Sequence, residues 1–174
     1  VGITSIEIPD AKTRLPSALL DLAFEKASLL IPDPAFALRS AECWHPSNLG
    51  TLGYAWLSSG SLRTALKRMA RYTRVIGQRM SARCADDEQG LHFIFDHGRG
   101  ETLVGQTMAD YTLALVVDMC RTNFGPALIL ESVSLRRPDP KNPKPYENFF
   151  SCPVHFGAAE DGFVLGRHDA DRPL

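Results

Sequence analysis

Residues 48–77 read NLGTLGYAWLSSGSLRTALKRMARYTRVIG, and they predict two successive helices separated by a Ser-Ser-Gly break. The part before the break is apolar nearly all round, so we expect its helix to be buried. After the break, apolar residues recur at steps of three and four and share one face of a helix. Ser61 is a suitable N-cap for this second helix, and Gly77 is a suitable residue to end it. The residues of the apolar face are Leu62, Ala65, Leu66, Met69, Ala70, Thr73 and Ile76.

The chain before this stretch predicts two further helices. Leu15 to Leu30 forms the first, and the prolines at 32 and 34 end it. A short helix follows at Ala35–Glu42. Residues 1–14 lack a helical period, and we expect them to be extended or irregular. The expected buried stripe of the first helix consists of Leu19, Leu22, Ala23, Leu29 and Leu30.

After Gly77 the period of the apolar residues changes from that of a helix to that of strands. Short alternating runs are typical of strands, and an acidic turn between the first two predicts a hairpin. The strands are expected at Met80–Ala85, Leu91–Asp96, Leu128–Arg136, Val154–Gly157 and Gly162–Leu165, the last two as a closing hairpin, with a long helix at Thr102–Asn123. This order predicts an α+β domain with N-terminal helices packed on an antiparallel sheet of four to five strands. A cupin-like barrel is the alternative.

The composition is that of an ordinary globular domain. Of 174 residues, 44% are hydrophobic and 22% are charged, and the formal net charge is −1. A chain this close to neutral is not expected to coat nucleic acid or an anionic membrane. No apolar run approaches the roughly 20 residues of a membrane helix and no signal peptide is visible, so we expect a cytoplasmic protein. The four cysteines are not spaced as metal ligands, and we expect free thiols.

No catalytic or nucleotide-binding motif is present. The chain lacks GxSxG, HExxH, GxGxxG and P-loop patterns, and its five histidines include no pair four residues apart. We therefore expect neither an enzyme nor a bound cofactor or metal. The alternative is a small-molecule enzyme domain that uses the Trp44/His45 loop and His92.

The outer face of the helix after the break is basic. A nucleic-acid contact is one interpretation, but aromatic residues are not interleaved on this face and it lacks Asn or Gln to read bases. We favour a face turned toward solvent or a protein partner. Its cations are Arg63, Lys67, Arg68, Arg71 and Arg74.

Aromatic residues on the predicted helices indicate either an ordinary core or a ligand pocket. Tyr54, Trp56, Tyr72 and Tyr111 come from three helices and have polar tips that can orient a mostly apolar ligand. Arg68 is a candidate partner for a carboxylate at the pocket mouth. We predict a ligand site at these five residues, for an organic acid or an amino-acid-like metabolite. A sugar is the alternative, because aromatic platforms suit sugars equally.

The chain resembles the N-terminal effector domain of AraC/XylS-type transcriptional regulators, in the arabinose-binding-domain-like branch. Residues 49–76 are similar to the pattern GxLGYaxxsSxTLgeALrxlaRYxrl of that family. Four shorter motifs follow the family in the same order, so the resemblance covers nearly the whole chain. They lie at residues 8–16, 34–39, 149–157 and 171–174.

The resemblance implies a single ligand-sensing and dimerisation domain over residues 1–174 that controls transcription in response to a small molecule. In that family a C-terminal domain with two helix-turn-helix motifs contacts DNA, and it is absent from this sequence. The family commonly forms homodimers through the effector domain. We expect the long helix at 102–123 as the interface, because Leu113, Leu115 and Val117 spread over more than one of its faces.

Overall fold

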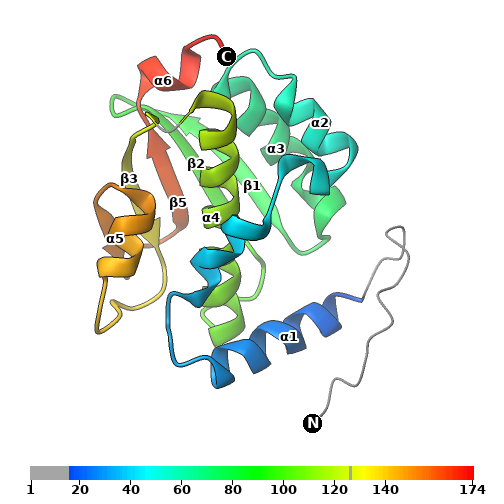
Figure 1. Ribbon diagram of the computed structural model, residues 1–174, viewed down its shortest axis with the longest axis vertical. Coiled ribbons are helices and arrows are strands. Elements are labelled where there is room, and N and C mark those ends of the chain that lie inside the picture. Colours follow the sequence, from blue (N-terminus) through cyan, green and yellow to red (C-terminus); the bar gives the residue numbers. More distant parts are fainter. Residues whose placement is uncertain (1–15, 126) are drawn as a thin grey trace.

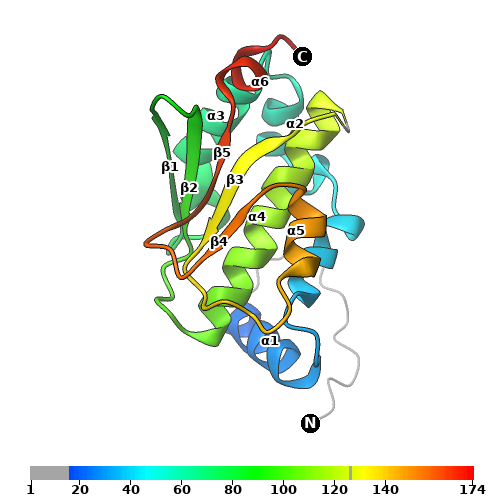
Figure 2. The ribbon, with the colours of Figure 1, turned by 90° about the vertical axis from the view of Figure 1, so that its left-hand side faces the viewer.

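Helices pack on one face of a five-stranded sheet in the computed structural model, which describes residues 16–125 and 127–174 (Figures 1 and 2). The helices are α1 (Ser17–Leu30), α2 (Thr51–Leu57), α3 (Leu62–Ile76), α4 (Leu103–Phe124), α5 (Lys144–Phe150) and α6 (Arg167–Asp171), with 3₁₀ helices η1 (Phe36–Cys43) and η2 (Pro46–Leu49). The strands are β1 (Ser81–Asp86), β2 (Leu91–Asp96), β3 (Leu130–Leu135), β4 (Val154–Phe156) and β5 (Asp161–Leu165). The predicted irregular segment 1–14 lies outside the described residues.

The sheet has the strand order β1-β2-β5-β3-β4, and its pairs are antiparallel except for β3 with β4. The predicted α+β architecture is confirmed. The predicted closing hairpin is wrong, because β5 lies between β2 and β3, and β4 pairs in parallel with β3 at the sheet edge. All five residues of β5 are buried, as expected of a central strand, whereas His155 in β4 is exposed. β4 and β5 are consecutive in the sequence, but they do not pair with each other in the sheet.

Helix α3, the second of the two helices predicted in residues 48–77, forms as expected. The Ser61 hydroxyl accepts the backbone N–H of Thr64 at 3.2 Å, so Ser61 is the N-cap of α3. Gly77 ends the helix in an extended conformation, and its N–H donates to the Thr73 carbonyl at 3.2 Å. Most of the predicted apolar face is buried, although Ile76 at its end is 45% exposed.

Helix α2, the first of the two helices predicted in residues 48–77, is only partly buried. The prediction that it is buried is therefore wrong. Trp56 is 1% exposed, whereas Tyr54 is 65% and Leu57 is 38% exposed. This helix has seven residues and packs mainly on α3 and η2, which cover one side of it. The opposite side, with Tyr54, is left to solvent.

Helix α4 is the centre of the domain and is enclosed by η1, α1, α3, α5 and the sheet (Figure 1). The three residues expected at a dimer interface are covered by the chain itself. Leu113 and Val117 are 0% exposed and Leu115 is 6% exposed. The prediction of a dimer interface on this helix is therefore wrong, because its apolar faces already form the core.

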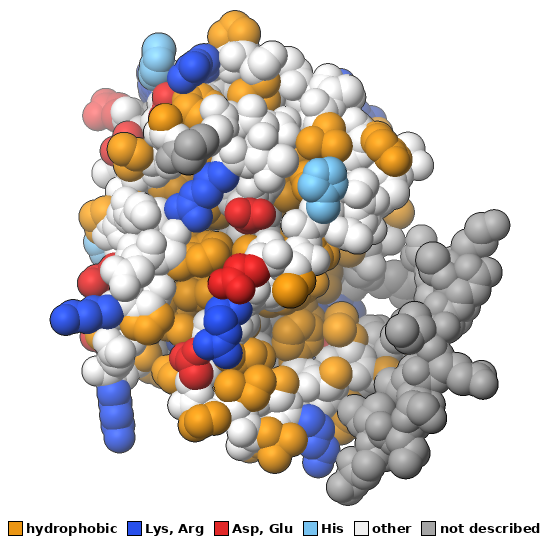
Figure 3. Space-filling view, viewed as in Figure 1, with side chains coloured by type: hydrophobic (Ala, Val, Ile, Leu, Met, Phe, Trp, Pro, Cys, Tyr) orange, Lys and Arg blue, Asp and Glu red, His pale blue; other side chains and the backbone are white. Residues whose placement is uncertain are grey.

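Helix α1 presents its apolar stripe to the surface, so the prediction that this stripe is buried is also wrong. Phe24 packs edge-on against Tyr111 with ring centroids 5.3 Å apart, and the Ser28 and Thr107 hydroxyls are 2.8 Å apart. These contacts turn the leucines outward, and Figure 3 shows hydrophobic side chains at the surface over α1 along the lower edge of the molecule. The exposed fractions are 51% for Leu19, 47% for Leu22, 66% for Leu29 and 78% for Leu30.

Mutation of Ser61 tests whether this residue is the N-cap of α3. Ser61→Ala removes the acceptor for the Thr64 N–H and should lower the free energy of unfolding by about 1 kcal/mol. Urea denaturation with a single fitted slope measures this change. Ser58→Ala is the matched control, because the exposed Ser58 hydroxyl accepts no helix N–H and only donates to the Ala55 carbonyl at 3.3 Å, and its effect should stay within about 0.5 kcal/mol. Equal losses in the two variants would contradict the N-cap assignment.

Candidate functional site

A cavity of about 110 Å³ lies on the helix-covered face of the sheet, between α3, α4 and strand β2. Alternation along β2 turns Phe93 and Phe95 toward this space. Residues on α3 and α4 reach it at steps of three and four, as one helix face does. Its lining residues are Trp44, Leu49, Met69, Thr73, Ile76, Met80, Phe93, Phe95, Tyr111, Thr112, Leu115, Val116 and Met119.

The wall of the cavity is almost wholly apolar, with a few polar tips. The Thr73 hydroxyl donates to the Met69 carbonyl at 2.7 Å and is therefore already bonded. In the described part of the chain, the Tyr111 hydroxyl, the Thr112 hydroxyl and the Trp44 indole N–H form no hydrogen bond. Burial raises the pKa of Tyr111, so its hydroxyl keeps its proton and is available as a donor. Three of the described lining residues thus carry an unpaired hydrogen-bond donor, while the wall of the cavity is apolar.

Of the five residues predicted to bind ligand, only Tyr111 lines this cavity. Trp56 lies outside it, where its Nε1–H donates to the Met119 carbonyl at 3.3 Å. Tyr54 and Tyr72 are 65% and 44% exposed on the outward sides of their helices. Arg68 donates to the Ala55 carbonyl and to Ser59 Oγ, at 2.9 and 3.1 Å. The prediction that these residues converge is wrong, because helix faces that the sequence cannot orient turn them apart.

Sequence reasoning missed most of the lining. The residues Met69, Thr73 and Leu115 follow the same apolar periodicity as ordinary core, and they do form core on either side of the cavity. The one usable signal is the presence of aromatic residues on the helices and beside them. Tyr111 from α4 and Trp44, which follows η1, lie at the cavity with Phe93 and Phe95 of β2.

The basic face of α3 makes contacts within the chain. The Arg63 guanidinium pairs with both Asp86 and Asp171, and its Nη2 lies 3.0 Å from Asp171 Oδ2. Lys67 Nζ lies 3.9 Å from Asp86 Oδ2. Arg63 and Lys67 therefore join α6 and β1 to the domain.

His45 and His92, the two histidines of the alternative enzyme hypothesis, do not lie in one site. His45 belongs to the loop that begins η2, where its Nδ1 accepts the Ser47 N–H at 3.2 Å. The neighbouring Trp44 faces the cavity on the helix side of the sheet. His92 precedes Phe93 on β2 and so points to the opposite face, with its Nε2 2.7 Å from an Asp87 carboxylate oxygen. The sheet separates the two groups.

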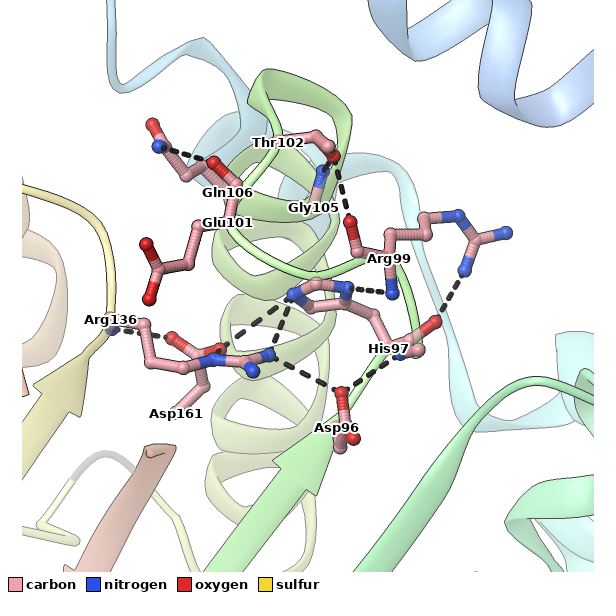
Figure 4. A network of polar contacts seen from close by, with 10 residues as sticks. Asp96, His97, Arg99, Glu101, Thr102, Gly105, Gln106, Arg136 and Asp161 are labelled. Atoms are coloured by element: carbon pink, nitrogen blue, oxygen red, sulfur yellow. Dashed lines mark hydrogen bonds and ion pairs between the residues drawn. The ribbon is translucent and has the colours of Figure 1, made fainter. Parts of the chain in front are cut away.

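A second group of polar residues lies where β2 ends and α4 begins (Figure 4). Arg136 donates to Asp161 at 2.7 Å, and its Nη2 lies 2.9 Å from His97 Nε2. His97 Nδ1 accepts the Arg99 N–H at 3.0 Å. Burial and the charge of Arg136 lower the pKa of His97. The space among these groups is about 10 Å³, enough for a single water. We therefore interpret the cluster as a structural contact and not as a ligand site.

A buried ion pair lies next to this polar cluster. The Arg137 guanidinium contacts Asp110, which is 0% exposed, and the Tyr146 hydroxyl lies 2.8 Å from Asp110 Oδ2. Tyr146 Oη also lies 3.0 Å from the Pro34 carbonyl oxygen. Together these groups connect α4, α5, the end of β3 and the segment before η1.

The candidate metal ligands of the described residues do not gather in one place. Within residues 16–125 and 127–174, no three His, Cys, Asp or Glu side chains come together as a metal site. The four cysteines are free. No helix in the same residues has the length and hydropathy needed to cross a membrane.

A family model matches the whole chain, and one solved structure has a similar fold. The sequence model of the family described as "Arabinose-binding domain of AraC transcription regulator, N-term" matches residues 1–174. A search of curated proteins finds no match. Among solved structures, the fold is similar to the transcriptional regulator CdpR from Pseudomonas aeruginosa, with a TM-score of 0.74 and 20% identity. That similarity covers 92% of this chain and 51% of the CdpR chain, so this chain spans about half the length of that regulator.

The buried carboxyl of Asp110 should make stability depend on pH. Burial raises its pKa from the ordinary 3.8 to about 7, against the opposing effect of Arg137. A carboxyl with a higher pKa in the folded state takes up a proton on folding, so stability falls as pH rises between the two values. The free energy of unfolding of the wild type should therefore fall relative to that of Asp110→Asn from about pH 4 to about pH 7, and the difference should level off above that range.

Denaturant titrations at several pH values measure this difference. Asp139→Asn, at an exposed carboxyl, controls for the loss of one negative charge. A wild type that gains stability over Asp110→Asn as pH rises would show that attraction to Arg137 outweighs burial.

Proposed function

Because the chain belongs to the family of N-terminal arabinose-binding domains of AraC transcription regulators, we propose that it senses a small-molecule effector at the cavity between α3 and α4. DNA is contacted only through a separate C-terminal helix-turn-helix domain, and the protein acts in the cytoplasm. The observation that carries this proposal is the cavity itself. An apolar, partly enclosed space with a few unpaired polar tips is the form that small-molecule sites commonly take.

The position of the cavity suits a sensor. Its walls come from η2, α3, α4, β2 and the segments that hold Trp44 and Met80, so a bound molecule contacts all of these elements at once. An effector shifts a conformational equilibrium only if it binds one state better than another. Filling this space favours the conformation in which α3, α4 and β2 are closest to the ligand.

A role without catalysis fits the arrangement of titratable groups. The Trp44/His45 loop and His92 lie on opposite faces of the sheet, and among the described residues no Asp, Glu, His or Lys lines the cavity. General acid–base catalysis needs such a group within hydrogen-bond distance of the substrate. The enzyme alternative therefore loses its proposed residues.

A thermal-shift screen of a metabolite library tests the sensor function. A ligand at 100 times its dissociation constant should stabilise the domain by about 2.7 kcal/mol. Val116→Phe places an aromatic ring in the cavity and should abolish the shifts given by the hits, while the filled cavity keeps the domain folded. Tyr54→Phe is the control, because Tyr54 lies outside the cavity, and its hits should be unchanged. Hits that survive Val116→Phe would place the effector elsewhere.

We further infer that the domain forms a homodimer through the outward face of α1. Leu22, Glu25, Lys26 and Leu29 share that face at steps of three, four and seven. In an antiparallel pair centred between Glu25 and Lys26, Leu22 meets the partner's Leu29 and Glu25 meets the partner's Lys26. Within the described residues neither charge has an ion-pair partner. The 14 residues of α1 span about 21 Å, which makes a small interface, so we expect micromolar association.

A charge swap tests this interface. Lys26→Glu sets like charges against each other at two symmetry-related places and should shift the protein toward monomer in sedimentation at micromolar concentration. The double variant Glu25→Lys, Lys26→Glu restores both pairs with reversed sign and should restore the dimer. A dimer that is indifferent to Lys26→Glu would contradict the proposed pairing.

A further inference from the structure

We propose that the effector is a compact, uncharged, ring-sized molecule with an apolar body and one hydrogen-bond acceptor. This inference rests on the proposed function, since it takes the cavity between α3 and α4 as the effector site. It departs from both chemistries expected from the sequence, a carboxylate and a sugar. Size, charge and hydrogen-bonding capacity each point to this class.

The absence of a charged partner argues against an organic acid. No Arg, Lys or His is among the residues that line the cavity, within the part of the chain that the structure describes. Arg68, the expected carboxylate partner, is held by the Ala55 carbonyl and Ser59 Oγ. A carboxylate moved from water to an apolar wall without a cation loses its hydration with nothing in return. The same reasoning disfavours the zwitterion of an amino acid.

The number of polar groups argues against a sugar. A sugar carries an oxygen on almost every carbon, and each must be hydrogen-bonded when it leaves water. Only three of its lining residues, Tyr111, Thr112 and Trp44, carry an unpaired hydroxyl or N–H among the described residues, and the wall is otherwise apolar. Each hydroxyl left without a partner costs about 1–3 kcal/mol. A molecule with one or two polar atoms can be satisfied by these three groups.

The volume sets the size of the apolar body. The cavity measures about 110 Å³. An engineered apolar cavity of roughly 150 Å³ in another protein holds benzene. This cavity is smaller, so a single six-membered ring is the largest body that it can enclose, and a short substituent on the ring would extend through its open side. The ring would contact Phe93 and Phe95 on the sheet side and Leu115, Val116 and Met119 on α4.

Tyr111 is the lining residue whose hydroxyl we assign to the acceptor of the ligand. Its ring is fixed edge-on by Phe24 of α1, 5.3 Å between centroids, and its hydroxyl has no partner among the described residues. A protonated phenol with a fixed ring loses little conformational entropy on binding. A carbonyl or ether oxygen on the ring substituent would complete this hydrogen bond.

Isothermal titration of the full chain with matched probes tests the proposed class. The probes are acetophenone, which has a ring and one acceptor, ethylbenzene, which lacks the acceptor, sodium benzoate and L-arabinose. Acetophenone should bind at least about ten-fold more tightly than benzoate or arabinose, which corresponds to 1.4 kcal/mol. Val116→Phe should abolish binding of both neutral ring probes, with Thr112→Phe at the cavity rim as a second blocking variant.

Two tyrosine variants test the hydrogen bond. Tyr111→Phe should weaken acetophenone by about two- to ten-fold, the range of one neutral hydrogen bond, and leave ethylbenzene unchanged. Tyr72→Phe is the matched control and should change neither, because Tyr72 is exposed and lies outside the cavity. Equal weakening of both probes by Tyr111→Phe would overturn the assigned acceptor contact.

The outcomes separate this inference from the proposed function. If benzoate or arabinose binds more tightly than acetophenone and Val116→Phe abolishes that binding, the ligand class is wrong and the effector site stands. If the probes bind equally well to wild type and to both blocking variants, the cavity is not the effector site, and the proposed function loses its carrying observation together with this inference.

Discussion

The packing of α4 against the sheet is the contact on which the rest of the domain depends. This helix has apolar residues on several faces, and twelve of its residues are buried. A helix of that kind must be surrounded, because apolar surface left in water costs about 25 cal/mol per Å². The sheet covers one side, and η1, α1 and α5 cover others. Helix α3 packs beside α4 on β1 and β2, and the cavity is the space that remains between them.

Polar contacts at one end of α4 then determine how the covering elements are held. Arg136 and Arg137, adjacent after β3, point to different carboxylates: Arg136 pairs with Asp161 on β5, and Arg137 pairs with Asp110 on α4. Both carboxyls are almost completely buried, so losing either arginine would leave a buried carboxyl without its partner. These pairs therefore fix the end of the sheet against the helix layer, while the cavity further along α4 remains free of charge.

The separation of charge from the cavity connects the fold to its proposed role. Ion pairs are directional and hold elements in one arrangement, whereas an apolar cavity accepts a ligand by size and surface. In this domain the first kind of contact lies at the strand ends, and the second lies in the middle of the helix layer. A ligand can thus alter the spacing of α3 and α4 without breaking the buried pairs.

The sequence by itself determined the elements and the family. The helical period of residues 62–76, the alternation in 91–96 and the motifs along the chain predicted α3, the β1–β2 hairpin, the α+β class and an AraC-type effector domain. Such signals are local, since they depend on which residues repeat along one segment. Only the tertiary structure decided which way each helix faces: it turned Leu22 and Leu29 of α1 outward, enclosed Leu113 of α4, and left Tyr111 alone of the predicted ligand residues at the cavity. Periodicity identifies an apolar face but not the element that packs on it, because that element comes from a distant segment of the chain. The position of β5 between β2 and β3 is an example, since such pairing forms only when the whole core folds.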